Sequence, residues 1–297
     1  MDTGEAIAAL GLVFAFSLLA YCSVLDWRTR KVPNPYWIML SLFGIALLII
    51  RVLADAADAA YLMILLPVFA ILSDIYIEGE GDSFLVRTAP LLKYSAAIVS
   101  TILLAYAWGD DMYFQHLLAV PVVMMIIVAF YITNVIRGGA DAKALAALAI
   151  VFPFYPNIGD YPLIDPASAE IEIFFPFTLT VLVNAAIIAG VLPLFFLFRN
   201  LAAREFEFPQ GLLGYKQNHN EIVGKHVWLM ERIENGNISR YVTPKSNEDL
   251  AKEVELLAKA GRTRIWVTPK LPFILPITAS VVLTAVVGGF LFLIVPA

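Results

Sequence analysis

The sequence contains very few residues of the kinds that build disulfide frameworks or metal centres. Among its 297 residues there are one cysteine, Cys22, and three histidines, His116, His219 and His226. A single cysteine forms neither a disulfide framework nor a CxxC zinc site. The histidines are scattered and lack the spacing of metal ligands. The sequence therefore predicts no metal and no cofactor.

Charged residues are also scarce. They make up 15% of the chain, whereas 60% of the residues are hydrophobic. Soluble domains are nearer half apolar and about one quarter charged. We therefore expect a multi-pass protein whose main partner is the lipid bilayer. The net charge of −5 gives no reason to expect a nucleic-acid partner. The first apolar run follows Asp2 and Glu5 rather than basic residues, which indicates a retained helix and not a signal peptide.

Eight stretches are candidates for membrane spans, each of which needs about 20 mostly apolar residues. They are, roughly, residues 5–25, 35–53, 60–76, 92–108, 116–136, 142–155, 171–198 and 272–295. The third and sixth are short. We expect all of them to be helical, because a lipid-exposed backbone must satisfy its own hydrogen bonds. The expected fold is an all-α polytopic membrane protein with about eight transmembrane helices and one small α+β domain.

The charges between these stretches alternate in sign. The N-terminal tail and the loops after the second, fourth and sixth stretches are acidic and have no Lys or Arg. The basic residues lie in the other loops, at Arg28, Arg30, Lys31, Arg87, Lys93, Arg137 and Lys143. The positive-inside rule makes the basic side cytoplasmic. Both termini then face outward, which requires an even number of spans and agrees with eight.

Residues 199–271 form the one long polar segment. They hold 12 of the 20 Lys and Arg residues but only 9 of the 25 Asp and Glu residues. Residues 247–260 have helical periodicity, with Ser246 or Asn247 as the expected cap and Gly261 as the stop. Strands are expected at 223–230 and 264–268, and a hairpin turn at 235–237. We expect three parts: a transmembrane catalytic domain (1–198), a cytoplasmic domain (199–271) and a final transmembrane helix (272–297).

Two aspartates lie at the ends of apolar stretches on the expected cytoplasmic side. Asp26 ends the first stretch, and Asp141 begins the sixth. Ionisable groups close to a bilayer are costly and usually functional. Two nearby carboxylates can hydrolyse a peptide bond, one as the base that activates water and the other as the acid that protonates the carbonyl oxygen. Gly138 and Gly139 would let a substrate backbone approach Asp141 closely.

These residues carry a family resemblance. Residues 26–34 (DWRTRKVPN) and 138–143 (GGADAK) resemble the paired motif of the type IV prepilin peptidases, which are GxGD membrane aspartyl proteases. Residues 198–200 (FRN) and 265–272 (IWVTPKLP) resemble the archaeal preflagellin (archaellin) peptidases. The resemblance implies an endopeptidase that removes short N-terminal leaders from archaellin or pilin precursors. It assigns the two catalytic carboxylates to Asp26 and Asp141.

The sequence departs from that pattern in two places. Ala140 occupies the position of the second motif glycine, and it fits if this residue is already near-helical. The two aspartates are also farther apart than expected for the archaeal enzymes, which indicates an inserted hairpin at about 60–108. An inserted pair of spans preserves the sidedness of everything that follows. Lys143 is expected to be an interfacial anchor, with tuning of the aspartate pair as the alternative.

A second literal match to the motif occurs at residues 79–82 (GEGD). We favour Asp141 over Asp82 as the catalytic residue, because a strong helix-forming sequence follows Asp141. Glu78, Glu80 and Asp82 nevertheless form an acidic cluster on the basic side. One hypothesis is that this cluster attracts the basic leader of the substrate, and the alternative is a solvated loop. Asp74, alone in the third stretch, is expected to pair with a neighbouring helix or to reach the interface.

Two other functions would use the same aspartates. A presenilin-like intramembrane protease also has two membrane aspartates, but the late Pro-Ala-Leu motif of that family is absent from this sequence. An ion-coupled transporter could use Asp26 and Asp141 as ion sites, although transporters usually place acids near mid-bilayer and contain inverted repeats. Bifunctional enzymes that also methylate their product resemble one another in a cysteine-rich cytoplasmic loop. This chain has one cysteine, which argues against that function.

Overall fold

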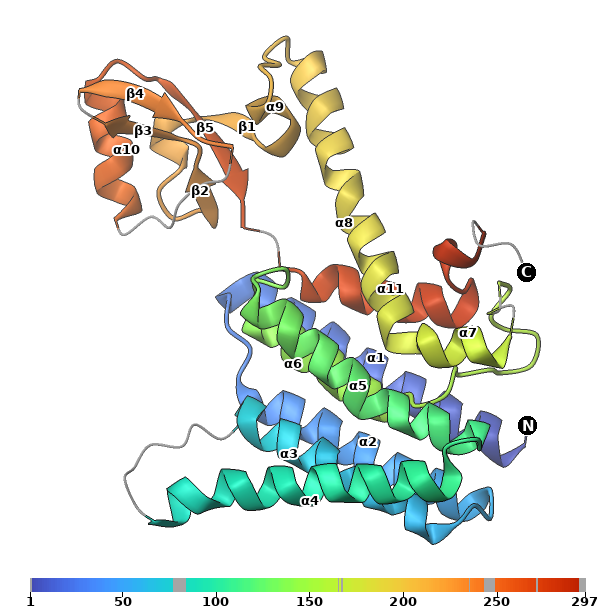
Figure 1. The fold of residues 1–297 in the computed structure, drawn as a ribbon. Coiled ribbons are helices and arrows are strands. Elements are labelled where there is room, and N and C mark those ends of the chain that lie inside the picture. Colours follow the sequence, from blue (N-terminus) through green and yellow to red (C-terminus); the bar gives the residue numbers. More distant parts are fainter. Residues whose placement is uncertain are drawn as a thin grey trace. The chain divides into compact units, whose positions relative to one another are not determined.

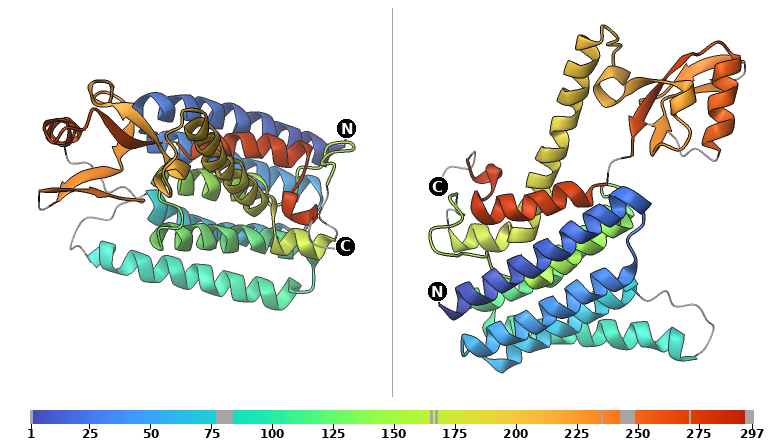
Figure 2. Two further views of the ribbon diagram at one scale, coloured as in Figure 1. Left: turned by 90° about the horizontal axis from the view of Figure 1, so that it is seen from above. Right: turned by 180° about the vertical axis from the view of Figure 1, so that it is seen from behind.

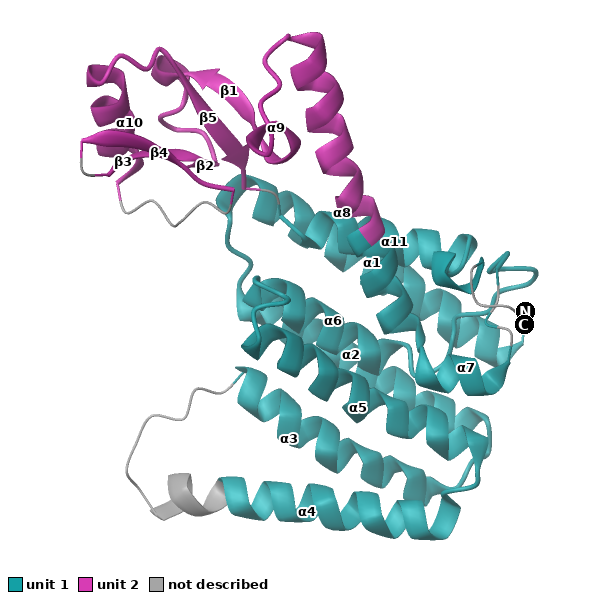
Figure 3. Ribbon diagram, turned by 45° about the horizontal axis from the view of Figure 1, so that its top comes forward, with its two compact units in different colours: residues 1–186, 272–297 teal, residues 187–271 magenta. Residues whose placement is uncertain are grey.

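The computed structural model describes residues 2–76, 84–164, 166, 168–234, 236–242, 249–270 and 272–293, with the backbone alone for residues 84–89. The chain forms two compact units, shown in Figures 1 and 3. The first, here called the helical unit, comprises residues 1–186 and 272–297. The second, the sheet unit, comprises residues 187–271. The chain therefore leaves the helical unit once and returns to it for its last helix.

The helical unit is built almost entirely from helices. Its elements are α1 (Thr3–Thr29), α2 (Asn34–Ala54), η1 (Ala59–Ile64), α3 (Leu65–Tyr76), α4 (Phe84–Trp108), α5 (Met112–Ile132), α6 (Gly139–Val151), α7 (Ala169–Phe174), the first part of α8 (Phe177–Ala202), α11 (Ile274–Val286) and η3 (Phe290–Leu293). The boundary between the two units falls within α8. Figure 2 shows the same helices from above and from behind.

The acidic residues of the loops have a local structural role as helix caps. Asp2 accepts the backbone N–H of Glu5 at 2.6 Å, and Glu5 accepts the N–H of Asp2 at 3.0 Å, which completes a capping box at the start of α1. Asp58 caps η1, and Asp111 caps α5. Each of these carboxylates satisfies a backbone donor that the helix itself leaves unpaired. Three of the acidic residues that the sequence predicted on one side thus cap helix N-termini.

Helix α6 forms the centre of the helical unit. Every residue from Ala144 to Val151 is buried, and α1, α2, α5 and α11 all contact the helix. A helix that is apolar on all sides is typical of such a central position. Gly44 of α2 allows the closest approach, because a Cβ there would lie 2.9 Å from the backbone nitrogen of Val151. The small residues of α6 therefore let the surrounding helices pack against its backbone.

Six helical segments of the described chain are long and apolar enough to cross a membrane. They are Thr3–Thr29, Asn34–Ala54, Ala59–Tyr76, Pro90–Trp108, Met112–Ile132 and Phe177–Ala202. They correspond to six of the eight expected stretches. The other two form α6 and α11, each of 13 residues. At 1.5 Å per residue such a helix is about 20 Å long, against ~30 Å for the hydrocarbon core.

The expected boundaries of these two short helices were wrong. The stretch 142–155 leaves the helix at Phe152, directly before Pro153, since the residue before a proline disfavours helical geometry. The stretch 272–295 is interrupted after Val286 by Gly288, which has a φ of 100°. The stretch 171–198 is also divided, because Pro176 separates α7 from α8.

Gly288 also allows a close backbone contact. The N–H of Ile164 donates to the carbonyl of Val287 at 2.9 Å, which brings residue 164 against the end of α11. A Cβ at position 288 would lie 2.8 Å from the carbonyl carbon of Ile164 and closer still to its oxygen. Asn184 of α8 supports the same corner, donating from Nδ2 to the carbonyl of Gly288 at 2.9 Å. Both the left-handed conformation and the close contact therefore require glycine here.

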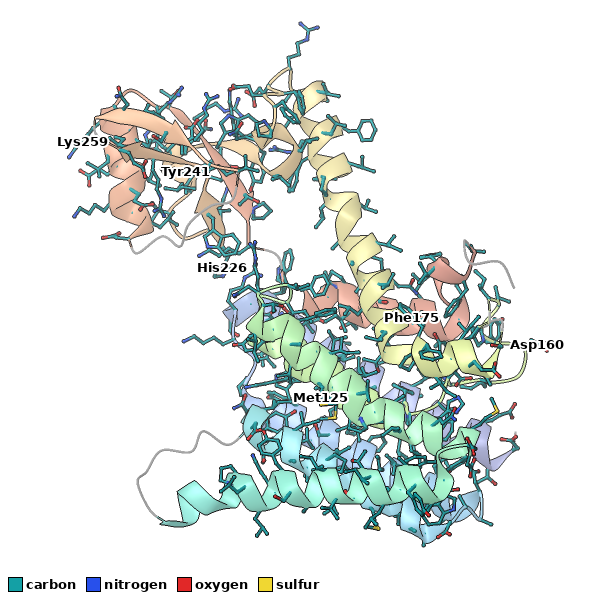
Figure 4. All side chains as sticks on the ribbon, in the orientation of Figure 1. Met125, Asp160, Phe175, His226, Tyr241 and Lys259 are labelled. Carbon is teal, nitrogen blue, oxygen red and sulfur yellow. The ribbon has the colours of Figure 1, made fainter. Side chains whose placement is uncertain are left out.

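The outer surface of the helical unit is apolar. Large side chains are exposed along the helices, among them Leu92, with 75% of its surface exposed, Tyr106, with 92%, and Met125, with 54%. Figure 4 labels Met125 on α5. A soluble protein rarely exposes so much contiguous apolar surface. The six long helices and this surface are those of a membrane protein.

The sheet unit packs one helix against a small sheet. Three antiparallel strands, β1 (Tyr215–Asn218), β5 (Arg264–Pro269) and β2 (Val227–Leu229), lie in the order β1-β5-β2. A separate hairpin joins β3 (Glu231–Glu234) to β4 (Asn237–Arg240). Helix α10 (Leu250–Lys259) contributes Val254 and Leu257 to a core shared with the strands. The short helices α9 (Gln210–Leu213) and η2 (His219–Glu221) complete the unit.

The sequence predicted part of this unit. The strand at 264–268 is confirmed, and the pairing of β3 with β4 confirms a hairpin at the expected place. Gly261, with a φ of 87°, ends the helical region. The expected strand 223–230 is confined to Val227–Leu229, since Gly224, with a φ of 88°, lies in a turn. Helix α10 is capped by Asp249, which accepts the N–H of Lys252 at 3.1 Å. Ser246 and Asn247, the expected caps, lie outside the described residues.

Ion pairs join the segments of the sheet unit. Lys216 Nζ donates to Glu207 Oε1 at 2.5 Å, and Arg240 forms a second ion pair with the same carboxylate. These hydrogen bonds hold the pKa of Glu207 below its ordinary value. Arg240 also pairs with Glu231, a carboxylate with 1% of its surface exposed. Residue 207 is thereby tied to β1 and β4.

Candidate active site

Asp26 lies in the last turn of α1 and is half-buried. The helix ends three residues later because Arg30 adopts a left-handed conformation, with a φ of 58°, and donates its N–H to the carbonyl of Asp26 at 2.9 Å. Pro33 then begins α2 with its fixed φ of −63°. Asp26 therefore lies at the end of α1, eight positions before α2 begins at Asn34.

Asp141 lies in the first turn of α6, with 8% of its surface exposed. Gly138 is the N-cap residue, and its carbonyl accepts the N–H of Ala142 at 3.1 Å. The carboxylate of Asp141 folds back over Gly138. A Cβ on Gly138 would lie 2.8 Å from Asp141 Cγ and closer still to Oδ2. The glycine thus makes room for the carboxylate itself.

The departure from the family motif at Ala140 is explained by the helix. Ala140 is the second residue of α6, so its backbone is helical and it does not need the freedom of glycine. Gly139 is the first helical residue, and a Cβ there would lie 3.4 Å from Tyr131 Oη, an ordinary contact distance. Of the two glycines, Gly138 is the one that the geometry requires.

Asp26 and Asp141 lie on helices that contact each other, α1 and α6, although 115 positions separate the two residues in the sequence. The charges of the two carboxylates interact. A hydrogen bond of 2.8 Å between Ser23 Oγ and Thr278 Oγ1 joins α1 to α11 one turn before Asp26. When two carboxylates lie close together, a state in which only one of them carries a charge is favoured. Such a pair can supply one base and one acid to the same reaction.

The other predicted site residues have different positions. Lys143 donates from Nζ to Asn34 Oδ1 at 2.8 Å. Glu78, Glu80 and Asp82 lie outside the described residues, so neither the acidic cluster nor the second literal motif has a described geometry. Two tyrosines near the site carried no signal in the sequence. Tyr131 lies over Gly139, and the ring of Tyr76 lies 5.9 Å from the ammonium of Lys143.

Asp74 pairs with a neighbouring helix, one of its two expected arrangements. It lies on α3 and accepts hydrogen bonds from Lys93 and Tyr94 of α4. Lys93 Nζ also donates to Ser73 Oγ at 2.8 Å. These contacts join the two helices of the hairpin predicted as an insertion, and they account for Asp74 without a catalytic role.

The described part of the chain contains no group of three or more His, Cys, Asp or Glu side chains that could hold a metal ion. The two histidines of the sheet unit occupy different settings. Nδ1 of His219 lies 3.1 Å from the carbonyl of Thr263, and His226 is exposed next to β2. His116 lies in the helical unit, 3.6 Å from Glu172 of α7.

Comparison with known proteins relates the chain to one group of enzymes. The profile of a family described as "Archaeal Peptidase A24 C-terminus Type II" matches residues 208–290. The matched region covers most of the sheet unit and continues through α11. It contains residues 265–272, which carried the second part of the resemblance in the sequence.

Individual relatives extend the match to the rest of the chain. A protein of Methanococcus maripaludis named preflagellin peptidase is 25% identical over 291 residues, with 95% of this chain and 94% of the relative covered. A protein of the same name from Methanocaldococcus jannaschii is 28% identical over 158 residues, with 51% of this chain and 62% of the relative covered. A third preflagellin peptidase, from Methanococcus voltae, is 28% identical over 158 residues, with 51% of this chain and 64% of the relative covered.

Proposed function

We propose that the chain is a membrane aspartyl endopeptidase of the preflagellin/prepilin peptidase family. Its substrates are precursors of archaellins or type IV pilin-like proteins, from which it removes a short basic N-terminal leader peptide. The observation that supports this proposal is the contact between α1 and α6, the helices that carry Asp26 and Asp141, together with the effect of the Asp26 charge on Asp141. The relatives named preflagellin peptidase support the substrate class.

In the proposed reaction, the two aspartates divide acid and base catalysis between them. Asp26, the more exposed carboxylate, is ionised and takes a proton from the attacking water. Asp141, which is almost fully buried, holds the proton, because burial disfavours a charged carboxylate. It donates this proton to the carbonyl oxygen of the scissile peptide bond. When the tetrahedral intermediate collapses, the amine leaves with a proton and each aspartate regains its starting state.

The site is proposed to face the cytoplasm. Arg28, Arg30 and Lys31 follow Asp26, and Arg137 precedes Asp141, whereas the opposite ends of the helices are capped by acids. The positive-inside rule supports this orientation. With α6 and α11 as short crossings beside the six long helices, the chain crosses the membrane eight times and both termini lie outside. Helix α6 tolerates its shortness because protein surrounds it.

The chain is proposed to divide into a catalytic transmembrane domain (1–198), a cytoplasmic domain (199–271) and a C-terminal helix (272–297), with an inserted hairpin at 60–108. The acidic cluster Glu78, Glu80 and Asp82 is proposed to attract the basic leader, because it would follow α3 on the same side as the catalytic pair. Oppositely charged groups near a site raise the local concentration of substrate.

The experiment is a cleavage assay with purified protein in lipid vesicles. An archaellin precursor is the substrate, and mass spectrometry measures the loss of its leader. The wild-type chain should cleave the precursor, and Asp26→Asn and Asp141→Asn should each abolish cleavage. Absence of cleavage by the wild type, with every precursor tried, would reject the peptidase function. Full activity of both variants would reject the two-aspartate mechanism.

A further inference from the structure

A polar contact joins the segment that follows Asp26 to the helix that begins with Asp141. Lys143, in the first turns of α6, donates from Nζ to Oδ1 of Asn34 at 2.8 Å. Asn34 is the first residue of α2 and is separated from the end of α1 by a short turn. This hydrogen bond therefore connects the helix that carries Asp141 to the start of α2, the helix that follows Asp26 in the chain, over 109 positions of sequence.

An aromatic ring from a third helix completes the contact. The ring of Tyr76, the last residue of α3, lies 5.9 Å from Lys143 Nζ, within the range of a cation–π interaction. The hydroxyl of Tyr76 forms a hydrogen bond of 3.1 Å with Ser41 Oγ of α2. The ammonium is thus held between an amide oxygen and a ring that is itself fixed on α2. We call Asn34, Lys143 and Tyr76 the clamp.

The geometry separates two roles for Lys143 that the sequence left open. Residues two positions apart on a helix point to nearly opposite sides, so Lys143 and Asp141 face different neighbours. The charge that acts on Asp141 is that of Asp26, while the ammonium of Lys143 contacts Asn34 and Tyr76. These contacts favour a role of the lysine in the spacing of the two helices over a role in the charge of the pair.

We propose that Lys143 and Tyr76 are positioning residues, which hold the start of α6 against the start of α2 so that Asp141 meets Asp26. The proposal rests on the proposed peptidase function for its kinetic consequences. Its structural consequence, the approach of positions 26 and 141, is independent of any substrate. The hairpin predicted as an insertion thereby contributes to the site through the last residue of its first helix.

Kinetic variants test the clamp. Lys143→Met and Asn34→Ala should each lower kcat by about 10²-fold, the effect of a misplacement of about 1 Å in an active site. KM and the pH profile of kcat should stay unchanged. Because both variants remove one hydrogen bond, the double variant should be no slower than the slower single variant. Tyr76→Phe keeps the ring and should retain activity, whereas Tyr76→Leu should be slower.

A matched lysine provides the control. Lys93 donates to Ser73 Oγ at the same 2.8 Å and also pairs with Asp74, and these contacts join α4 to α3 rather than to α6. Lys93→Met should therefore leave kcat at the wild-type value. A pH profile shifted by Lys143→Met but not by Asn34→Ala would overturn the proposal in favour of charge tuning. Equal losses in Lys143→Met and Lys93→Met, in step with lost thermal stability, would overturn it in favour of general structural support.

A measurement without substrate tests the same proposal separately from the peptidase function. Cysteines replace Asp26 and Asp141 in a Cys22→Ala chain, and a short bifunctional thiol reagent cross-links them in vesicles. The cross-linking rate should fall about tenfold when Lys143→Met is added, since the reagent spans only closely spaced thiols. It should be unchanged by Lys93→Met. An unchanged rate with Lys143→Met would overturn the proposal, whether or not the chain proves to be a peptidase.

Discussion

Replacing Gly138 by alanine should disable the site while leaving the fold intact. Gly138 has a φ of −92°, which any residue can adopt, so the backbone itself tolerates the change. The obstacle is the Asp141 carboxylate. The added Cβ would lie 2.8 Å from Asp141 Cγ and closer still to Oδ2, whereas real Cβ atoms essentially never approach another atom within 3.0 Å. The carboxylate must therefore rotate away from its present position.

The size of the effect follows from this displacement. Moving a catalytic group by about 1 Å costs ~10²-fold in rate, which corresponds to ~2.7 kcal/mol of transition-state stabilisation. The cost to folding is smaller, because a side chain pushed off its preferred rotamer loses only about 0.5–1.5 kcal/mol. The expected signature of Gly138→Ala is therefore a large fall in kcat with nearly normal thermal stability.

The neighbouring glycine is the matched control. A Cβ on Gly139 would lie 3.4 Å from Tyr131 Oη and needs no rearrangement, so Gly139→Ala should keep kcat within about two-fold of the wild type. Both variants are assayed for leader removal from an archaellin precursor, and thermal unfolding is recorded in the same detergent. Normal kcat in Gly138→Ala, or a greater loss in Gly139→Ala, would refute the account of how the motif positions its aspartate.

Three further predictions concern stability and pH. Asn184→Leu should lower the stability of the helical unit by about 1–3 kcal/mol, because it leaves the buried carbonyl of Gly288 without its Nδ2 donor. Gly288→Ala should cost at least about 1–2 kcal/mol from its φ of 100° alone, with the contact to Ile164 adding to it, and both variants are measured by thermal unfolding. The pKa of Glu207 is lowered in the folded state, so its ion pair with Lys216 stabilises the sheet unit at pH values above the ordinary pKa of 4.5. This stabilisation should be lost as the pH falls through the lowered pKa. Hydrogen exchange should show that Glu207→Gln loses less amide protection over the same fall in pH than the wild type does.

The sequence predicted the features that depend on strong local signals. Apolar stretches of about 20 residues located the six long helices. Single glycines located the turn at 236 and the end of the helical region at 261. We expected Ala140 to fit the motif if its backbone was near-helical. This expectation also rested on local sequence, because a run of strong helix formers follows Ala140. The structure places Ala140 in the first turn of α6.

Other features depend on contacts that no local pattern encodes. The length of α11 is set at Gly288 by its contact with Ile164, more than 100 positions away. Tyr76 contacts Lys143 because α3 and α6 both pack beside α2, and neither residue has a distinctive neighbourhood in the sequence. The sequence pointed to Asp26 and Asp141 through their positions at the ends of apolar stretches, and the resemblance assigned the catalytic roles to them. The distinction between Gly138 and Gly139 required the position of a side chain.

The central claim is that Asp26 and Asp141 are the two catalytic carboxylates. Its most direct test compares Asp26→Asn, Asp141→Asn and Asp82→Asn in the cleavage of one archaellin precursor, with equal amounts of folded protein in vesicles. Asp82 is the matched control, since it ends the second literal motif in the sequence. We predict that the first two variants release no leader and that Asp82→Asn cleaves with an unchanged kcat. Retained cleavage by Asp141→Asn together with its loss in Asp82→Asn would contradict the assignment.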